Sequence, residues 1–153
     1  MTYAKETPAK DRASAHAAIT SAVKLLNDNA ARLSGEEKKS IANIRTIDVD
    51  PTASRSSVDV VLGTLHVNAG QLTEDPARFA TDIAHDSFHI AQWKAGSPSS
   101  GAAAERDATH FQIGIGRKIG LSEKQIGYLK NYADHIDNYK DYWGSPVTHP
   151  VHH

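Results

Sequence analysis

Cysteine is absent from this 153-residue chain. Its absence excludes disulfides, zinc sites built on thiolates and thiol nucleophiles, although it does not fix the cellular compartment. Long apolar runs are also lacking, so no segment is expected to span a membrane. The polar residues 1–10 show no apolar core of a cleavable secretory signal. We therefore expect a soluble protein that is cytoplasmic or exported by a non-classical route.

An excess of charge of one sign is missing as well. The chain has 17 Lys and Arg against 18 Asp and Glu, which gives a net charge of −1. Without a basic stretch or an interleaved aromatic platform, nucleic acid and anionic membranes are not expected partners. The hydrophobic fraction of 39% suits a globular protein, and the length is most simply one domain, residues 1–153.

The apolar pattern predicts an α+β fold that is mostly helical. Helical spacing over residues 8–33 and 36–44 predicts two N-terminal helices, and alternation and β-branched residues over 45–67 predict two or three strands. We expect this small sheet to pack against the next helix. Residues 45–143 would form the core of the domain, and residues 144–153, with three histidines, a flexible tail.

Three further helices follow the predicted strands. They are expected at residues 76–94, 102–119 and 122–139. Thr73 is a candidate cap for the first, Gly120 ends the second, and Ser122 opens a capping box for the third. The late aromatic residues are expected to be core rather than a ligand platform, most clearly at Tyr128 and Tyr132.

The sequence Ile83-Ala-His-Asp-Ser-Phe-His-Ile-Ala-Gln92 carries the clearest chemical signal. His85 and His89 stand four residues apart in a predicted helix, so both rings point the same way, one turn apart. Two such imidazoles can bind one metal ion, and the carboxylate of Asp86 beside them can take a proton from water at that metal. The competing interpretation is an amphipathic helix with a wet polar face and incidental histidines.

A third ligand is available in the following helix. Glu105 lies sixteen residues after His89, at the edge of the apolar face of residues 102–119. A carboxylate at the margin of a buried stripe needs compensation, and a metal ion would supply it. A salt bridge to Arg106 or to a lysine is the simpler alternative.

This pattern resembles the HExxH helix of the zincin metallopeptidases that use glutamate as third ligand. The string Ala104-Glu105-Arg106-Asp107-Ala108 is similar to the Glu-x-x-Ala pattern of that group, and the order strand, histidine helix, carboxylate helix is similar to its core. The resemblance implies a zinc ion bound by His85, His89 and Glu105, with Asp86 as general base and a peptide or protein substrate. It also implies a minimal zincin-like fold. Small metallopeptidase-like domains of bacterial toxins and effectors show a looser likeness.

The chain departs from that family at Asp86, where the family has glutamate. The shorter side chain places its oxygens farther from the reacting water. Other polar residues are therefore candidates for supporting roles. Asp82 or Asp107 would hold a ligand ring from behind, and His66 or His110 would stabilise an oxyanion. Either histidine is also an alternative to Glu105 as ligand.

Two other functions remain open at the level of sequence. A catalytically weak or inactive domain would bind metal or a partner without cutting it. The doublet His85-Asp86 also resembles the HD phosphohydrolases, for which His16 with Asp134 or Asp137 would be needed, but the predicted sheet argues against that all-helical fold.

Overall fold

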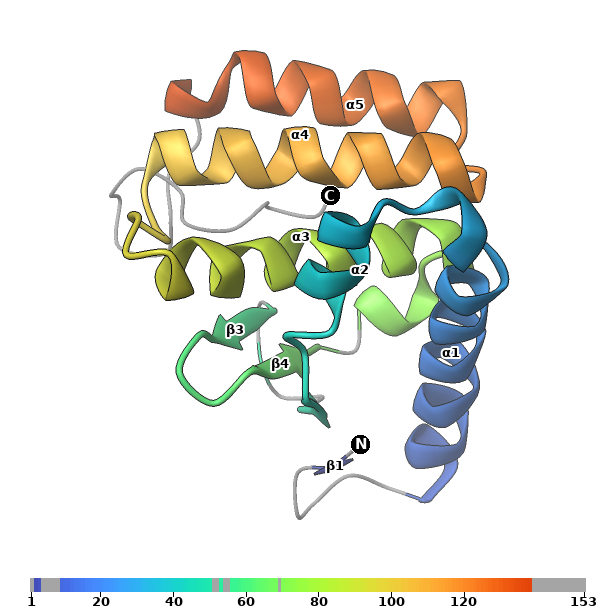
Figure 1. Ribbon diagram of the computed structural model, residues 1–153. Coiled ribbons are helices and arrows are strands. Elements are labelled where there is room, and N and C mark those ends of the chain that lie inside the picture. Colours follow the sequence, from blue (N-terminus) through green and yellow to red (C-terminus); the bar gives the residue numbers. More distant parts are fainter. Residues whose placement is uncertain (1, 4–8, 51–52, 54–55, 69, 139–153) are drawn as a thin grey trace.

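The computed structural model describes residues 2–3, 9–50, 53, 56–68 and 70–138 of the chain. It is mostly helical with one small sheet, as the sequence predicts (Figure 1). The helices are α1 (Ala9–Asp28), α2 (Gly35–Ile41), α3 (Pro76–Lys94), α4 (Ala102–Ile119) and α5 (Glu123–Asp134). Short 3-10 segments lie after α1 at Ala30–Arg32, before α3 at Gln71–Thr73 and after α5 at Ile136–Asn138.

The sheet has the strand order β1-β2-β4-β3. Its strands are β1 (Thr2–Tyr3), β2 (Thr46–Val49), β3 (Ser57–Asp59) and β4 (Thr64–Val67). β2 runs parallel to β1 and β4, whereas β3 is antiparallel to β4. Three strands come from the segment in which strands were expected, and the two-residue β1 at the other edge was not predicted. Gly63, whose φ is positive, lies in the turn between β3 and β4.

Helix α3 is the central element of the fold. It packs against α1, α2, α4 and β3, so it is enclosed on most sides. Its predicted apolar side is confirmed, because Phe79, Ala80, Ile83 and Ala84 are buried in one cluster with side chains of α1 and the sheet. Figure 1 shows α3, α4 and α5 stacked as successive layers, with the sheet on the opposite side of α3. Any polar group that α3 directs towards α4 is therefore shielded from water.

The helix ends follow the sequence signals with one correction. α3 and α4 begin and end at the predicted residues. The cap of α3 is Asp75 rather than Thr73, because the Asp75 carboxylate accepts the Arg78 N–H at 2.9 Å. Thr73 lies in the preceding 3-10 segment, where its hydroxyl donates to the Gly70 carbonyl. The Ser122 capping box is confirmed.

The remaining expectations for the helices are met in part. α1 ends at Asp28, α2 ends at Ile41, and α5 ends at Asp134, each a few residues short of the prediction. Tyr132 is a core residue with 1% of its surface exposed, and Tyr128 packs partly buried against a second apolar cluster. Residue 8, the predicted start of the first helix, lies outside the described residues, as do the late aromatic residues 139, 142 and 143 and the tail.

Within the described residues, no helix offers an apolar stretch of the length that crossing a bilayer requires.

Gly63 is the turn residue on which the strand pair depends. Its φ of +70° suits glycine, and a Cβ there would lie 2.6 Å from the Asn43 carbonyl oxygen. We expect Gly63→Ala to lower the free energy of unfolding by at least about 1–2 kcal/mol, the cost of a left-handed residue with a side chain. Chemical denaturation measures this.

The matched control is Gly114→Ala within α4, where a Cβ meets no atom within 4 Å. This change should stabilise the protein by about 0.5–1 kcal/mol, since alanine favours the helix. Equal effects of the two substitutions would contradict the role assigned to Gly63.

Candidate metal centre

The polar side of α3 faces the protein interior. Each of its predicted polar residues is buried: Asp82, His85, Asp86, His89 and Gln92. The interpretation as a solvent-exposed polar face is therefore wrong. Burying this many polar groups on one helix is costly unless they are paired, so their partners define the site.

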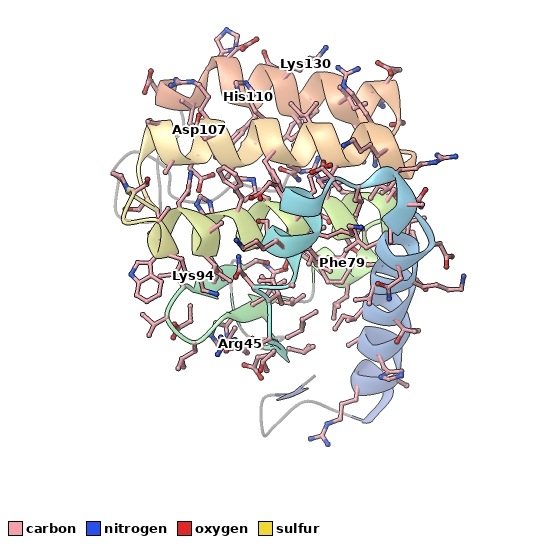
Figure 2. All side chains as sticks on the ribbon, viewed as in Figure 1. Arg45, Phe79, Lys94, Asp107, His110 and Lys130 are labelled. Atoms are coloured by element: carbon pink, nitrogen blue, oxygen red, sulfur yellow. The ribbon has the colours of Figure 1, made fainter. Side chains whose placement is uncertain are left out.

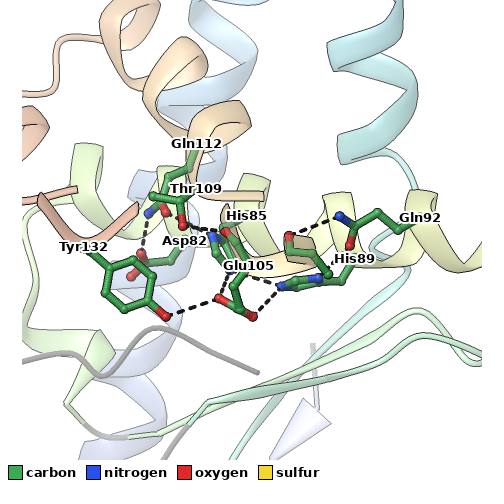
Figure 3. A network of polar contacts seen from close by, with 9 residues as sticks. Asp82, His85, His89, Gln92, Glu105, Thr109, Gln112 and Tyr132 are labelled. Carbon is green, nitrogen blue, oxygen red and sulfur yellow. Dashed lines mark hydrogen bonds and ion pairs between the residues drawn. The ribbon is translucent and has the colours of Figure 1, made fainter. Parts of the chain in front are cut away.

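Glu105, in the first turn of α4, is the common partner of the two histidines. α3 and α4 lie side by side, joined by a short connection that reverses the chain (Figure 1). The Glu105 Oε1 atom lies 2.9 Å from His89 Nε2, and Oε2 lies 3.2 Å from His85 Nε2. The two Nε2 atoms are 3.2 Å apart. One ligand atom from each of the three residues lies within 4.8 Å of the others, so the group could bind a metal ion (Figure 3).

The Glu105 carboxylate is fully buried. Its Oε2 atom accepts a hydrogen bond from the Tyr132 hydroxyl of α5 at 3.4 Å. Its Oε1 atom, despite the close approach of His89, has no partner with hydrogen-bond geometry among the described residues. A buried carboxylate oxygen that accepts no hydrogen bond is a suitable ligand atom for a cation.

Each histidine is held from behind by a glutamine. His85 Nδ1 lies 3.1 Å from Gln112 Oε1 of α4, and His89 Nδ1 lies 2.9 Å from Gln92 Oε1 of α3. Both glutamines are buried. These contacts turn the Nε2 side of both rings towards Glu105, as Figure 3 shows.

A buried group of charges lies behind Gln112. Asp82 Oδ1 accepts from Gln112 Nε2 at 2.9 Å and lies 3.4 Å from Arg78 Nε. Burial, with the neighbouring Asp82 carboxylate, raises the pKa of Glu74 to about 10, so Glu74 is protonated at neutral pH. The charges of Arg78 and Asp82 therefore balance each other beside the site.

The charges within the cluster stabilise one another. Burial opposes ionisation of Glu105, but the positive charge of His85 and His89 and their close contacts with the carboxylate outweigh it, so the pKa of Glu105 lies below its ordinary value. Burial likewise opposes a charge on His89, but the Glu105 carboxylate outweighs that effect and the pKa of His89 lies above its ordinary value. A metal ion bound between Glu105 and the two imidazoles would displace the proton that these groups share.

The structure separates the other candidate residues from the cluster. His66 is partly exposed on β4 and pairs with Asp48 of β2 at 3.2 Å, while Asp107 and His110 are exposed on the side of α4 away from α3 (Figure 2). Asp82 does contribute, but through Gln112. The suggested salt bridge of Glu105 with Arg106 is wrong, because Arg106 binds the Ala133 carbonyl and Asp137 instead.

Sequence reasoning missed three contributors. The sequence suggests no role for Gln92 or Gln112, and it predicts Tyr132 only as a core residue. Gln92 follows His89 by three residues and Gln112 follows Glu105 by seven, so helical spacing places each glutamine on the same side as its neighbour. The hydroxyl of Tyr132 required knowledge of how α5 packs.

No protein-family model matches the chain, and no significant match exists among curated proteins or among solved structures. Support for a function therefore comes from the chemistry of the cluster.

The opposite pKa shifts predict a pH dependence of stability for the metal-free protein. A lowered Glu105 pKa adds stability above its ordinary value of 4.5, which is lost as the pH falls through the folded-state pKa. A raised His89 pKa adds stability below its ordinary value of 6.5, which is lost as the pH rises through the folded-state pKa.

The measurement is denaturant unfolding in chelator across pH, for the wild-type protein and Glu105→Gln. We expect the stability difference to be largest between about pH 4.5 and 6.5 and to decline on both sides. A difference that does not vary with pH would contradict the coupling of Glu105 with the imidazoles.

Proposed function

We propose that this chain is a zinc-dependent hydrolase of metallopeptidase type, with His85, His89 and Glu105 as metal ligands. The observation that carries the proposal is the convergence of two Nε2 atoms and one carboxylate within 4.8 Å. The helix spacing of the histidines and the position of Glu105 on the next helix agree with the zincin-like pattern of the sequence.

The donor set favours zinc over other common ions. Two imidazoles and one carboxylate provide three ligands of the borderline type that zinc accepts, whereas calcium and magnesium require more oxygen atoms. One carboxylate leaves a net positive charge on a divalent ion, and such an ion lowers the pKa of bound water and polarises a carbonyl.

Asp86 is the residue proposed as general base. It follows His85 on α3, has 5% of its surface exposed, and is close enough for its charge to help raise the pKa of His89. From this position its carboxylate would take a proton from the attacking water and deliver it to the leaving nitrogen of a peptide or amide bond. Its short side chain makes this step the one most sensitive to geometry.

A second candidate is a metal-binding module without catalysis. It is favoured by the burial of the ligands, since His85 is 1% exposed and His89 and Glu105 are 0% exposed. Structural metal sites are closed, whereas catalytic sites keep a position open for water and substrate. The phosphohydrolase alternative has no such support, because His16, Asp134 and Asp137 are exposed and stand apart from the cluster.

The first test is metal binding. Purified protein, stripped with chelator and titrated with zinc, should bind one ion per chain with an increase in thermal midpoint. At a free zinc concentration a hundredfold above the dissociation constant, the gain in stability is about 2.7 kcal/mol. The double variant His85→Ala, His89→Ala should lose both the ion and the zinc-dependent stabilisation.

Two control variants separate this site from other histidines. His110→Ala removes an exposed histidine of α4 and should leave binding unchanged. Alanine at His149, His152 and His153 tests whether the tail accounts for the metal. Zinc that is absent from the wild-type protein, or that persists in the double variant, would refute the proposed ligands.

The second test addresses catalysis at Asp86. In a protein with bound zinc, Asp86→Asn should reduce hydrolysis of a quenched fluorescent peptide library by about 100- to 10,000-fold, the range for loss of a general base. Asp86→Glu should increase it, because the longer side chain brings the base nearer to the water. Zinc content is measured on the same samples.

Stoichiometric zinc without peptide cleavage in the wild-type protein and Asp86→Glu would favour the metal-binding module. Cleavage that is equal in the wild-type protein and Asp86→Asn would show that Asp86 is not the base. Activity confined to phosphate esters with manganese would favour phosphohydrolase chemistry.

A further inference from the structure

The Nε2 atoms of His85 and His89 face one another, so the position of the proton on each ring decides whether these nitrogens can bind a metal ion. A ring nitrogen binds a metal only through its lone pair, so in a neutral imidazole the proton must be on the other nitrogen. His85 Nε2 and His89 Nε2 lie 3.2 Å apart, and each is within 3.2 Å of a Glu105 oxygen. The contacts behind the rings determine which nitrogen carries the proton.

The amide of Gln112 has only one orientation that satisfies its partners. Its Nε2 atom lies 2.9 Å from Asp82 Oδ1 and 3.2 Å from Thr81 Oγ1. The Thr81 hydroxyl already donates its proton to the Arg78 carbonyl, so it accepts from Gln112. With both partners accepting, the NH₂ group points at them and the Oε1 atom points at His85 Nδ1. An amide oxygen accepts, so His85 carries its proton on Nδ1.

Gln92 is oriented in the same way by a different group. Its Nε2 atom donates to the Ala104 carbonyl at 3.1 Å. A backbone carbonyl can only accept, so Gln92 Oε1 points at His89 Nδ1, 2.9 Å away, and that nitrogen is the donor. Reversing the amide would place its oxygen against the Ala104 carbonyl oxygen, and two acceptors cannot form a hydrogen bond.

From these contacts we infer that Gln92 and Gln112 are positioning residues that fix the tautomers of His89 and His85. Each holds a proton on Nδ1 and leaves the Nε2 lone pair directed at the space beside Glu105. Because both partners are neutral amides, the only negative charge in the ligand set is that of Glu105. A divalent ion there keeps more positive charge than it would with carboxylates behind its histidines. The effect on zinc rests on the proposed function, whereas the tautomers do not.

The inference is tested first without metal. Two-bond ¹H–¹⁵N correlation spectra of the zinc-free protein, at a pH where both rings are neutral, report which nitrogen carries the proton. We expect Nδ1–H for His85 and His89. In Gln112→Leu the His85 proton should no longer be confined to Nδ1, while His89 is unchanged; Gln92→Leu should show the reverse. Gln112→Glu keeps an accepting oxygen and should retain Nδ1–H.

Zinc affinity is the second measurement. Each leucine variant should bind zinc about 10- to 100-fold more weakly, the range for removing such partners, and Gln112→Glu should bind more tightly than Gln112→Leu. Gln125→Leu, in the capping box of α5, is the matched glutamine control and should bind as the wild type does.

A proton on Nε2 in the wild-type protein, or Nδ1–H retained in both leucine variants, would overturn the inference. Correct tautomers in a protein that binds no zinc would refute the proposed function alone. If Gln112→Leu does not fold, Gln92→Leu decides the outcome, because Gln92 lies near the end of α3 and its side chain has, among the described residues, one hydrogen-bond partner besides His89, the Ala104 carbonyl.

Discussion

The rest of the site depends on one ionic contact, the Glu105 carboxylate enclosed between two imidazoles. A carboxylate with none of its surface exposed loses several kcal/mol of hydration, which only close positive or polarised partners recover. Those partners come from two neighbouring helices: His85 and His89 from α3, and the Tyr132 hydroxyl from α5. The contacts of this one carboxylate therefore hold α3, α4 and α5 together. This also explains why the pKa shifts of Glu105 and His89 are opposite in direction.

Much of this arrangement could be predicted from the sequence because it rests on helix periodicity. A spacing of four residues places His85 and His89 on one side whatever surrounds the helix, and the limits of α3 follow from Pro76 and from its apolar stripe. Glu105 could be identified because a carboxylate beside a buried stripe needs a partner. In each case the signal lies within one helix or its immediate connection.

What sequence could not supply are the contacts that depend on how helices and strands are oriented against one another. His66 was a reasonable candidate, but the parallel pairing of β2 with β4 places it opposite Asp48 instead. His110 lies five residues from Glu105, on the other side of α4. Helical spacing places Gln112 on the Glu105 side of α4, but it does not reveal the partners of Gln112 or of the Tyr132 hydroxyl, which lie on other helices. The wet-face interpretation failed for the same reason, because periodicity identifies a polar stripe but not what covers it.

The network behind the ligands connects stability with chemistry. Gln112 contacts His85 at one end and Thr81 and Asp82 at the other, while Asp82 is balanced by Arg78. A charged residue behind His85 would have to be neutralised again in this buried region, whereas an amide orients the ring without adding charge. The two glutamines therefore pair buried polar groups and orient both rings with Nε2 towards Glu105. The common direction of the two rings brings both Nε2 atoms to one carboxylate, and this arrangement could bind a metal ion.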